Sequence, residues 1–169
     1  MFKKNIVLVG FMGSGKSLVS KEISRRLKKE VISTDDLIEK REGKSIADIF
    51  RDSKETYFRK LEKEVVKEVA AKQGVIIDCG GGVVLDEENI KTLKENGILF
   101  YLKASAECLY QQIQLGKPRP LLQVPDPLGK VKELLKQREN YYSKADHTID
   151  CDFTTVDDMA NKILRKLEQ

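Results

Sequence analysis

The sequence lacks tryptophan and contains one histidine and three cysteines. The cysteines Cys79, Cys108 and Cys151 stand far apart and form no CxxC pair, which argues against a structural zinc site and a disulfide framework. No apolar run approaches the roughly 18 residues of a membrane span, and the run near the N-terminus ends without a signal-peptide cleavage site. We therefore expect a cytoplasmic protein with no membrane partner.

The charge balance is mild, since 31 lysines and arginines stand against 27 aspartates and glutamates and give a net charge of +4. The charges are interspersed along the chain, whereas a nucleic-acid-binding protein usually gathers its basic residues. We expect no nucleic-acid partner. The length of 169 residues suits one domain, which we place at residues 1–169, and we expect a monomer.

Apolar runs alternate with helical patterns along the chain. Continuous apolar runs, typical of strands buried on both faces, occur at residues 6–9, 31–32, 75–77, 98–102 and, more weakly, 147–149. Segments with apolar residues on one helical face occur at residues 16–29, 55–72, 128–142 and 156–167. This alternation predicts an α/β fold with a central parallel sheet of about five strands and helices on both faces.

One segment lacks periodicity. Residues 115–126 hold three of the four prolines and join two predicted helices. We interpret this segment as the centre of a mobile lid loop, at about residues 112–127, over a ligand site.

Residues Gly10 to Ser17 fit the phosphate-loop pattern G-x-x-x-x-G-K-[ST], between a predicted buried strand and a predicted helix. Glycines let backbone N–H groups converge on phosphate oxygens, and the helix adds the positive end of its dipole. Lys16 can reach the β- and γ-phosphates of ATP, and the Ser17 hydroxyl can ligate Mg²⁺ directly. The alternative is a glycine turn with a chance lysine, which the strand–loop–helix context disfavours. The ATP-binding residues predicted in this loop are Gly13, Ser14, Gly15, Lys16, Ser17 and Leu18.

A phosphate loop alone does not separate kinases from GTPases. Asp78-Cys79-Gly80-Gly81 fits the D-x-x-G pattern of a GTPase. No N-K-x-D element that reads guanine follows, because Asn161-Lys162 continues into an amphipathic helical pattern. The sequence therefore favours a kinase.

Further motifs follow in order: Ser33-Thr34-Asp35, Phe58-Arg59 with Glu62, Gly80-Gly81-Gly82, Arg119-Pro120-Leu121-Leu122, and Arg138 with Tyr142. Together with the phosphate loop, they make the chain resemble the shikimate kinase family over nearly its whole length. The resemblance implies a P-loop kinase fold, a substrate-binding helical segment at about residues 34–62 and Mg²⁺ as the cofactor. It also implies transfer of the γ-phosphate of ATP to the 3-hydroxyl of shikimate.

The two arginines of these motifs suit a carboxylate ligand. Arg59 and Arg138 can each hold a carboxylate through two parallel hydrogen bonds, and Glu62 shares a helical face with Arg59 and can orient its guanidinium. By resemblance, both arginines bind the carboxylate of shikimate. Without the resemblance, a pair of surface salt bridges is an equal alternative.

Asp35 follows the second predicted strand, where a carboxylate can orient the acceptor hydroxyl or take its proton. The resemblance assigns it this role, and the alternative is a helix N-cap at Thr34 or Asp35. A run of glycines lets the backbone approach a ligand. By resemblance Gly80, Gly81 and Gly82 line the acceptor site, and the alternative is a chain turn.

Arg119 resembles the lid arginine of the family, which approaches the transferring phosphate of ATP when the lid closes. With Lys16 and Asp35 it completes the catalytic set that the resemblance implies.

The chain departs from the family pattern near the metal. Many members have an aspartate where this chain has Ser33, and Asp78 stands where a small residue is usual. We expect Asp78 to replace the missing carboxylate, so that Asp35 and Asp78 hold Mg²⁺ through water.

A second departure concerns the adenine. Gln112 stands where the family often has an arginine that stacks on the base, so we expect looser packing or the use of Lys103 and the turn at residues 152–156. Lys54 also replaces a usual glycine. Two other functions stay open from the sequence: a related kinase for gluconate or a nucleoside monophosphate, and a non-catalytic nucleotide-binding relative.

Overall fold

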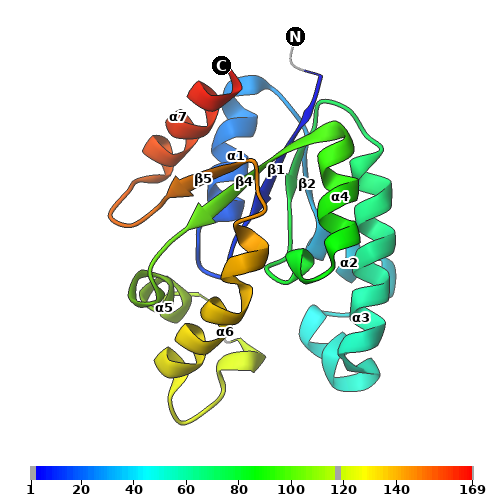
Figure 1. Cartoon of the computed structure of the whole chain (residues 1–169). Coiled ribbons are helices and arrows are strands. Elements are labelled where there is room, and N and C mark those ends of the chain that lie inside the picture. The colour runs from blue at the N-terminus through cyan, green and yellow to red at the C-terminus, as the bar shows by residue number, and fades with distance from the viewer. Residues whose placement is uncertain (1–2, 117–118, 169) are drawn as a thin grey trace.

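The computed structural model describes residues 3–116 and 119–168. Strands and helices alternate along these residues (Figure 1). The strands are β1 (Asn5–Val9), β2 (Val31–Ser33), β3 (Ile76–Asp78), β4 (Gly97–Lys103) and β5 (His147–Asp150). The helices are α1 (Lys16–Leu27), α2 (Thr34–Glu42), α3 (Ile46–Ala70), α4 (Glu87–Asn96), α5 (Ala106–Gln114), α6 (Pro127–Tyr142) and α7 (Val156–Leu167), with short 3₁₀ turns at Val83–Leu85 and Pro120–Leu122.

The strands form one sheet in the order β2-β3-β1-β4-β5, and every neighbouring pair is parallel. β1 lies at the centre, with Ile6 opposite Ile76 of β3 on one side and Ile98 of β4 on the other. The prediction of a five-stranded parallel sheet is confirmed. Because all strands run the same way, their carboxyl ends meet at one edge, where open α/β sheets bind ligands.

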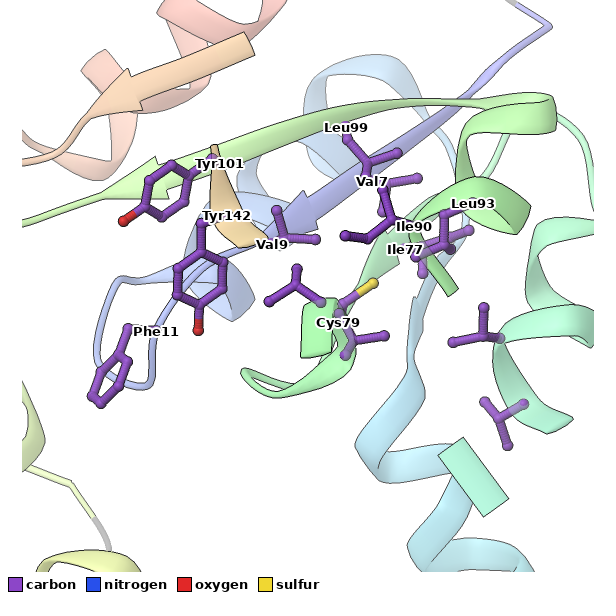
Figure 2. Packing of buried hydrophobic residues seen from close by; sticks show 14 of the residues in the cluster. Val7, Val9, Phe11, Ile77, Cys79, Ile90, Leu93, Leu99, Tyr101 and Tyr142 are labelled. Atoms are coloured by element: carbon purple, nitrogen blue, oxygen red, sulfur yellow. The ribbon is translucent and has the colours of Figure 1, made fainter. Parts of the chain in front are cut away.

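Helices cover both faces of the sheet because side chains on β1 alternate between two apolar cores. Val7 and Val9 face a core closed by α3, α4, α5 and α6 (Figure 2). Ile6 and Leu8 face a second core closed by α1 and α7 (Figure 1). Burial on both faces explains why this strand is a continuous apolar run in the sequence.

Helix α3 starts earlier than the sequence pattern predicts. The helical pattern begins at Glu55, but Ser45 caps a helix that already starts at Ile46. The two parts meet at a kink at Lys54, which has a φ of 64° and a ψ of 163°. This non-helical residue interrupts the apolar periodicity, which is why the first two turns were missed.

The predicted lid joins α5 and α6, as expected, and contains the 3₁₀ turn at Pro120–Leu122. Residues 117–118, at its centre, lie outside the described residues. Within the part of the chain that the structure describes, no helix is both long and apolar enough to cross a membrane.

Candidate active site

The phosphate loop connects the end of β1 to the first turn of α1. Gly13 and Gly15 have φ angles of 81° and 88°, in the left-handed region that favours glycine. A Cβ on Gly13 would lie 2.9 Å from the carbonyl oxygen of Leu109 in α5, so only glycine fits there. Lys16 begins α1 directly after Gly15, which leaves the positive end of the helix dipole at the loop.

Lys16 folds back over its own loop. Its Nζ donates hydrogen bonds to the carbonyl oxygens of Gly10, at 2.8 Å, and Phe11, at 3.1 Å. Burial lowers the pKa of Lys16, and the nearby charges of Asp78 and Asp35 oppose that change. The lysine is thus placed between the loop and two carboxylates.

Asp78 ends β3 beside the phosphate loop. The Ser17 hydroxyl donates to its Oδ2 at 2.6 Å, and the aspartate is only 6% exposed. Burial raises the pKa of Asp78, while Lys16 and the bond from Ser17 favour the ionised form. Asp78 is also the register partner of Ser33 on the adjacent strand β2. The two positions named in the metal hypothesis therefore lie side by side.

Asp35 lies in the first turn of α2. The alternative that Thr34 or Asp35 caps this helix is wrong, because Ser33 is the N-cap and its Oγ accepts the Asp36 N–H at 3.1 Å. Asp35 Oδ1 is buried and has no hydrogen-bond partner among the described residues. Burial raises the pKa of Asp35, and the charge of Lys16 opposes this shift.

Two of the three glycines after β3 leave room for neighbouring side chains, and the middle one lies against the phosphate loop. A Cβ on Gly80 would lie 2.5 Å from Asp35 Oδ1, and a Cβ on Gly82 would lie 2.4 Å from a terminal nitrogen of Arg59. A Cβ on Gly81 would lie 3.5 Å from the Met12 nitrogen in the phosphate loop. The run also makes a turn, since the Val83 N–H bonds the Gly80 carbonyl. It therefore serves as a turn and brings the aspartate, the loop and the arginine together.

Arg59 and Glu62 form a pair on one face of α3, as the spacing predicts. Arg59 donates to Glu62 Oε1 at 2.7 Å and to the exposed Glu55 at 3.1 Å. Glu62 is 1% exposed, and its Oε2 has no hydrogen-bond partner among the described residues. Burial raises the pKa of Glu62 to about 7, against the effect of the Arg59 charge. The pair is buried on its glutamate side, unlike a surface salt bridge.

Arg138 projects from α6 and is 7% exposed, with its guanidinium 5.6 Å from the centre of the Phe11 ring. It forms no ion pair with any carboxylate in the described ranges, so the surface salt-bridge alternative is wrong for this residue. Four residues later, the Tyr142 hydroxyl donates to the Gly81 carbonyl at 2.6 Å. Tyr142 belongs to a motif found in the sequence, but no local signal indicates this contact.

Arg119 is exposed in the loop before α6, and its charge contributes to the lowered pKa of Lys16. Gln112 is exposed on α5.

A surface groove of about 720 Å³ is lined by Lys103 and Asp152 among other residues, and Lys103 forms an ion pair with Glu139 at 2.9 Å. None of the groove's lining residues belongs to the predicted catalytic set of Lys16, Asp35 and Arg119. The groove is therefore separate from the predicted catalytic residues.

The oxygen donors of the site suit Mg²⁺. In the described part of the chain, no group of three or more histidine, cysteine, aspartate or glutamate side chains could enclose a metal ion. Mg²⁺ commonly binds one or two protein oxygens and keeps several waters and substrate phosphates. The Ser17 hydroxyl and the adjacent Asp78 carboxylate fit that pattern.

A family model described as "SKI: Shikimate kinase" matches residues 12–168. The chain belongs to the shikimate kinase family. Members of this family are ATP-dependent kinases that act on shikimate. The predicted family and enzyme class are confirmed.

Named shikimate kinases match the chain almost end to end. The shikimate kinase of Caldanaerobacter subterraneus subsp. tengcongensis is 45% identical over 162 residues, which cover 96% of this chain and 95% of that one. The shikimate kinase of Thermodesulfovibrio yellowstonii is 42% identical over 98% of this chain and 96% of its own length.

Solved structures agree with the sequence relatives. A shikimate kinase from Acinetobacter baumannii in complex with shikimate superposes with a TM-score of 0.93 at 36% identity, over 98% of this chain and 93% of that one. A shikimate kinase from Aquifex aeolicus gives a TM-score of 0.81 at 35% identity, over 97% and 96%. A gluconokinase from Sinorhizobium meliloti shares the fold, with a TM-score of 0.65 over 99% of this chain and 93% of that one, but at only 18% identity.

Proposed function

We propose that this chain transfers the γ-phosphate of ATP to the 3-hydroxyl of shikimate and releases ADP and shikimate 3-phosphate. The observation that carries the proposal is the packing around the glycine run. A Cβ on Gly80 would collide with the Asp35 carboxylate and one on Gly82 with the Arg59 guanidinium, and Gly81 faces the phosphate loop. An acceptor held there would have a carboxylate-binding arginine on one side and the phosphate-transfer machinery on the other.

On the donor side, backbone N–H groups from Gly13 to Leu18 would bind the phosphates of ATP. Lys16 would exchange its bonds to two loop carbonyls for the β- and γ-phosphate oxygens. Its charge would then stabilise the negative charge that spreads over the transferring group. This lysine is one of three catalytic residues in the proposal.

On the acceptor side, Arg59 and Arg138 would bind the carboxylate of shikimate. Arg138 is buried without an ion pair among the described residues, so an anionic ligand would supply a countercharge. Glu62 holds one terminal nitrogen of Arg59 at 2.7 Å, and the ligand carboxylate would replace the exposed Glu55, which accepts the other terminal nitrogen at 3.1 Å. Backbone N–H groups of the glycine run would bind the acceptor hydroxyls.

Asp35 is the proposed general base. Its unpartnered Oδ1 faces the glycine run, and burial raises its pKa, which makes the ionised carboxylate a stronger base. The proton of the acceptor hydroxyl would pass to Asp35 as the hydroxyl oxygen bonds to the γ-phosphorus and the bond to ADP breaks. Arg119, the third catalytic residue, would bind the same phosphate from the lid.

Ser17 would hold Mg²⁺ directly, and Asp35 and Asp78 would hold it through water. The ion would neutralise phosphate charge during transfer. Asp78 can serve this site because it already accepts a hydrogen bond from the Ser17 hydroxyl.

The Asp78 hypothesis has its own test. Asp78→Asn should raise the Mg²⁺ concentration for half-maximal rate by about 10-fold, the low end for residues that orient metal ligands. Ser33→Asp should recover much of that loss in the double variant, because the two positions are register partners and aspartate also caps helices. A lower melting temperature with an unmoved Mg²⁺ titration would instead make Asp78 a structural strand-end residue.

Several sequence predictions stay proposals: one domain at residues 1–169, the substrate-binding segment at about 34–62, the lid at about 112–127, a monomeric state and a cytoplasmic location. The absence of nucleic-acid and membrane partners also stays a prediction.

The proposed reaction is tested by measuring ADP release with purified protein, ATP, Mg²⁺ and a panel of acceptors. The panel contains shikimate, quinate, gluconate and nucleoside monophosphates. We expect turnover on shikimate to exceed turnover on the others. Rapid turnover on gluconate without turnover on shikimate would contradict the proposal, and no ADP release with any acceptor would indicate a non-catalytic relative.

A further inference from the structure

The side chain of Tyr142 reaches from the end of α6 to the glycine run. It is fully buried, and its hydroxyl donates to the Gly81 carbonyl at 2.6 Å. Gly81 has no side chain that could fix its orientation, and glycine has more backbone freedom than any other residue. The Val83 and Leu85 N–H groups bond the carbonyls of Gly80 and Gly82, and the tyrosine hydroxyl adds a restraint on the Gly81 carbonyl between them.

The restrained peptide carries a possible donor to a ligand. A trans peptide bond is planar, so the Gly81 carbonyl and the Gly82 N–H lie in one plane and point in opposite directions. The Gly80 N–H bonds the Thr34 hydroxyl at 3.0 Å. The N–H groups of Gly81 and Gly82 bond no residue in the described ranges. Fixing the carbonyl thus also fixes the direction of an unused N–H.

The tyrosine is held in place by stacking on a second ring and by its position in the last turn of α6. Its ring stacks on Tyr101 of β4, with ring centres 4.8 Å apart and an angle of 12° between the planes (Figure 2). Burial raises the pKa of Tyr142 to about 12, so the hydroxyl stays protonated and remains a donor. Tyr142 also lies one helical turn after Arg138, on the same face of α6. One helix end therefore supplies both the arginine and the group that orients the glycines.

We propose that Tyr142 is a positioning residue for the acceptor site, acting through the Gly81 carbonyl on the Gly82 N–H. This inference rests on the proposed function, in which shikimate binds beside that run. Tyr142 touches neither substrate in this proposal, so its effect is expected on acceptor binding and not on nucleotide binding.

The test compares Tyr142→Phe with Tyr101→Phe. Both variants lose one hydroxyl and keep the stacked rings, but the Tyr101 hydroxyl bonds Glu139 and not the glycine run. Without the tyrosine hydroxyl, the Gly82 N–H has to be oriented when the acceptor binds, so Tyr142→Phe should raise the KM for shikimate by roughly tenfold, about 1.4 kcal/mol of binding free energy. The KM for ATP should change less than about twofold, and Tyr101→Phe should leave both values near wild type.

A readout that needs no substrate separates this inference from the proposed function. In Tyr142→Phe, the amide NMR signals of Gly81 and Gly82 should shift, whereas Tyr101→Phe should leave them unchanged. If wild-type protein does not phosphorylate shikimate, the proposed function fails while the amide test still decides whether Tyr142 orients the run. Unmoved amide signals, or a melting-temperature loss with an unchanged KM for shikimate, would overturn the positioning role.

Discussion

Lys54 interrupts α3 with a φ of 64° and a ψ of 163°. This part of backbone space is used almost only by glycine, because a Cβ meets the neighbouring peptide groups there. Lys54 is exposed, and its side chain forms no hydrogen bond or ion pair with the residues that the structure describes. Replacing it with glycine should therefore relieve strain and stabilise the folded protein.

The expected gain follows from two opposing effects. A residue other than glycine in such a region costs about 1–3 kcal/mol. Glycine at this site would add conformational entropy to the unfolded chain, which costs about 0.4–1 kcal/mol. The net effect of Lys54→Gly is then a gain of about 1 kcal/mol in the free energy of unfolding, or about 2–4 °C in the melting temperature of a chain of this size.

Thermal and urea unfolding of the wild type and three variants would measure this effect. Lys54→Ala removes the charge and keeps the Cβ, so it should unfold at nearly the wild-type midpoint. Lys28→Gly provides a second comparison, because Lys28 has a φ of 55° and a ψ of 41° at a helix end, where the left-handed conformation is milder. Equal stability of Lys54→Gly and Lys54→Ala would refute the strain argument.

Three other predictions concern the site. Lys16→Ala should lower the rate of phosphoryl transfer by more than about tenfold, a loss above roughly 1.4 kcal/mol in steady-state assays, while the melting temperature holds. Arg59→Lys should raise the KM for shikimate strongly and that for ATP little, because lysine loses the two-pronged geometry; an equal rise for both would contradict the acceptor role. Burial holds the pKa of Glu62 at about 7, above its usual 4.5, so stability from this group is full below pH 4.5 and is lost as the pH rises through about 7. Glu62→Gln should flatten that pH dependence in urea unfolding, and an unchanged slope would show that Glu62 is ionised throughout.

Much of the fold could be predicted because the sequences of buried parallel strands are continuous apolar runs. The β1 run is read correctly since Ile6 and Val7 face different cores and must both be apolar. The start of α3 was missed because Lys54 breaks its periodicity. The cap of α2 was also misplaced, because serine, threonine and aspartate stand together at residues 33–35 and each could cap.

The site could be predicted only as a set of residues. The phosphate-loop motif identifies Lys16 and Ser17, but the bond between Ser17 and Asp78 depends on how β3 lies beside β1, 61 residues along the chain. Tyr142 and Gly81 are also 61 residues apart in the sequence, and no local sequence pattern indicates their contact. Such contacts follow from strand order and helix packing, which sequence periodicity does not specify.

The central place of β1 has a consequence for how the protein is made. β1 is synthesised first, yet its partners β3 and β4 follow only at residues 76–78 and 97–103. At a synthesis rate of about 5–20 residues per second, the run around Val7 waits roughly 5–20 seconds for β4 to emerge. Both edges of this apolar strand are unpaired until β3 emerges, and one edge stays unpaired until β4 follows. Chains truncated before β4 should therefore aggregate or be held by chaperones, even though they already contain the complete phosphate loop.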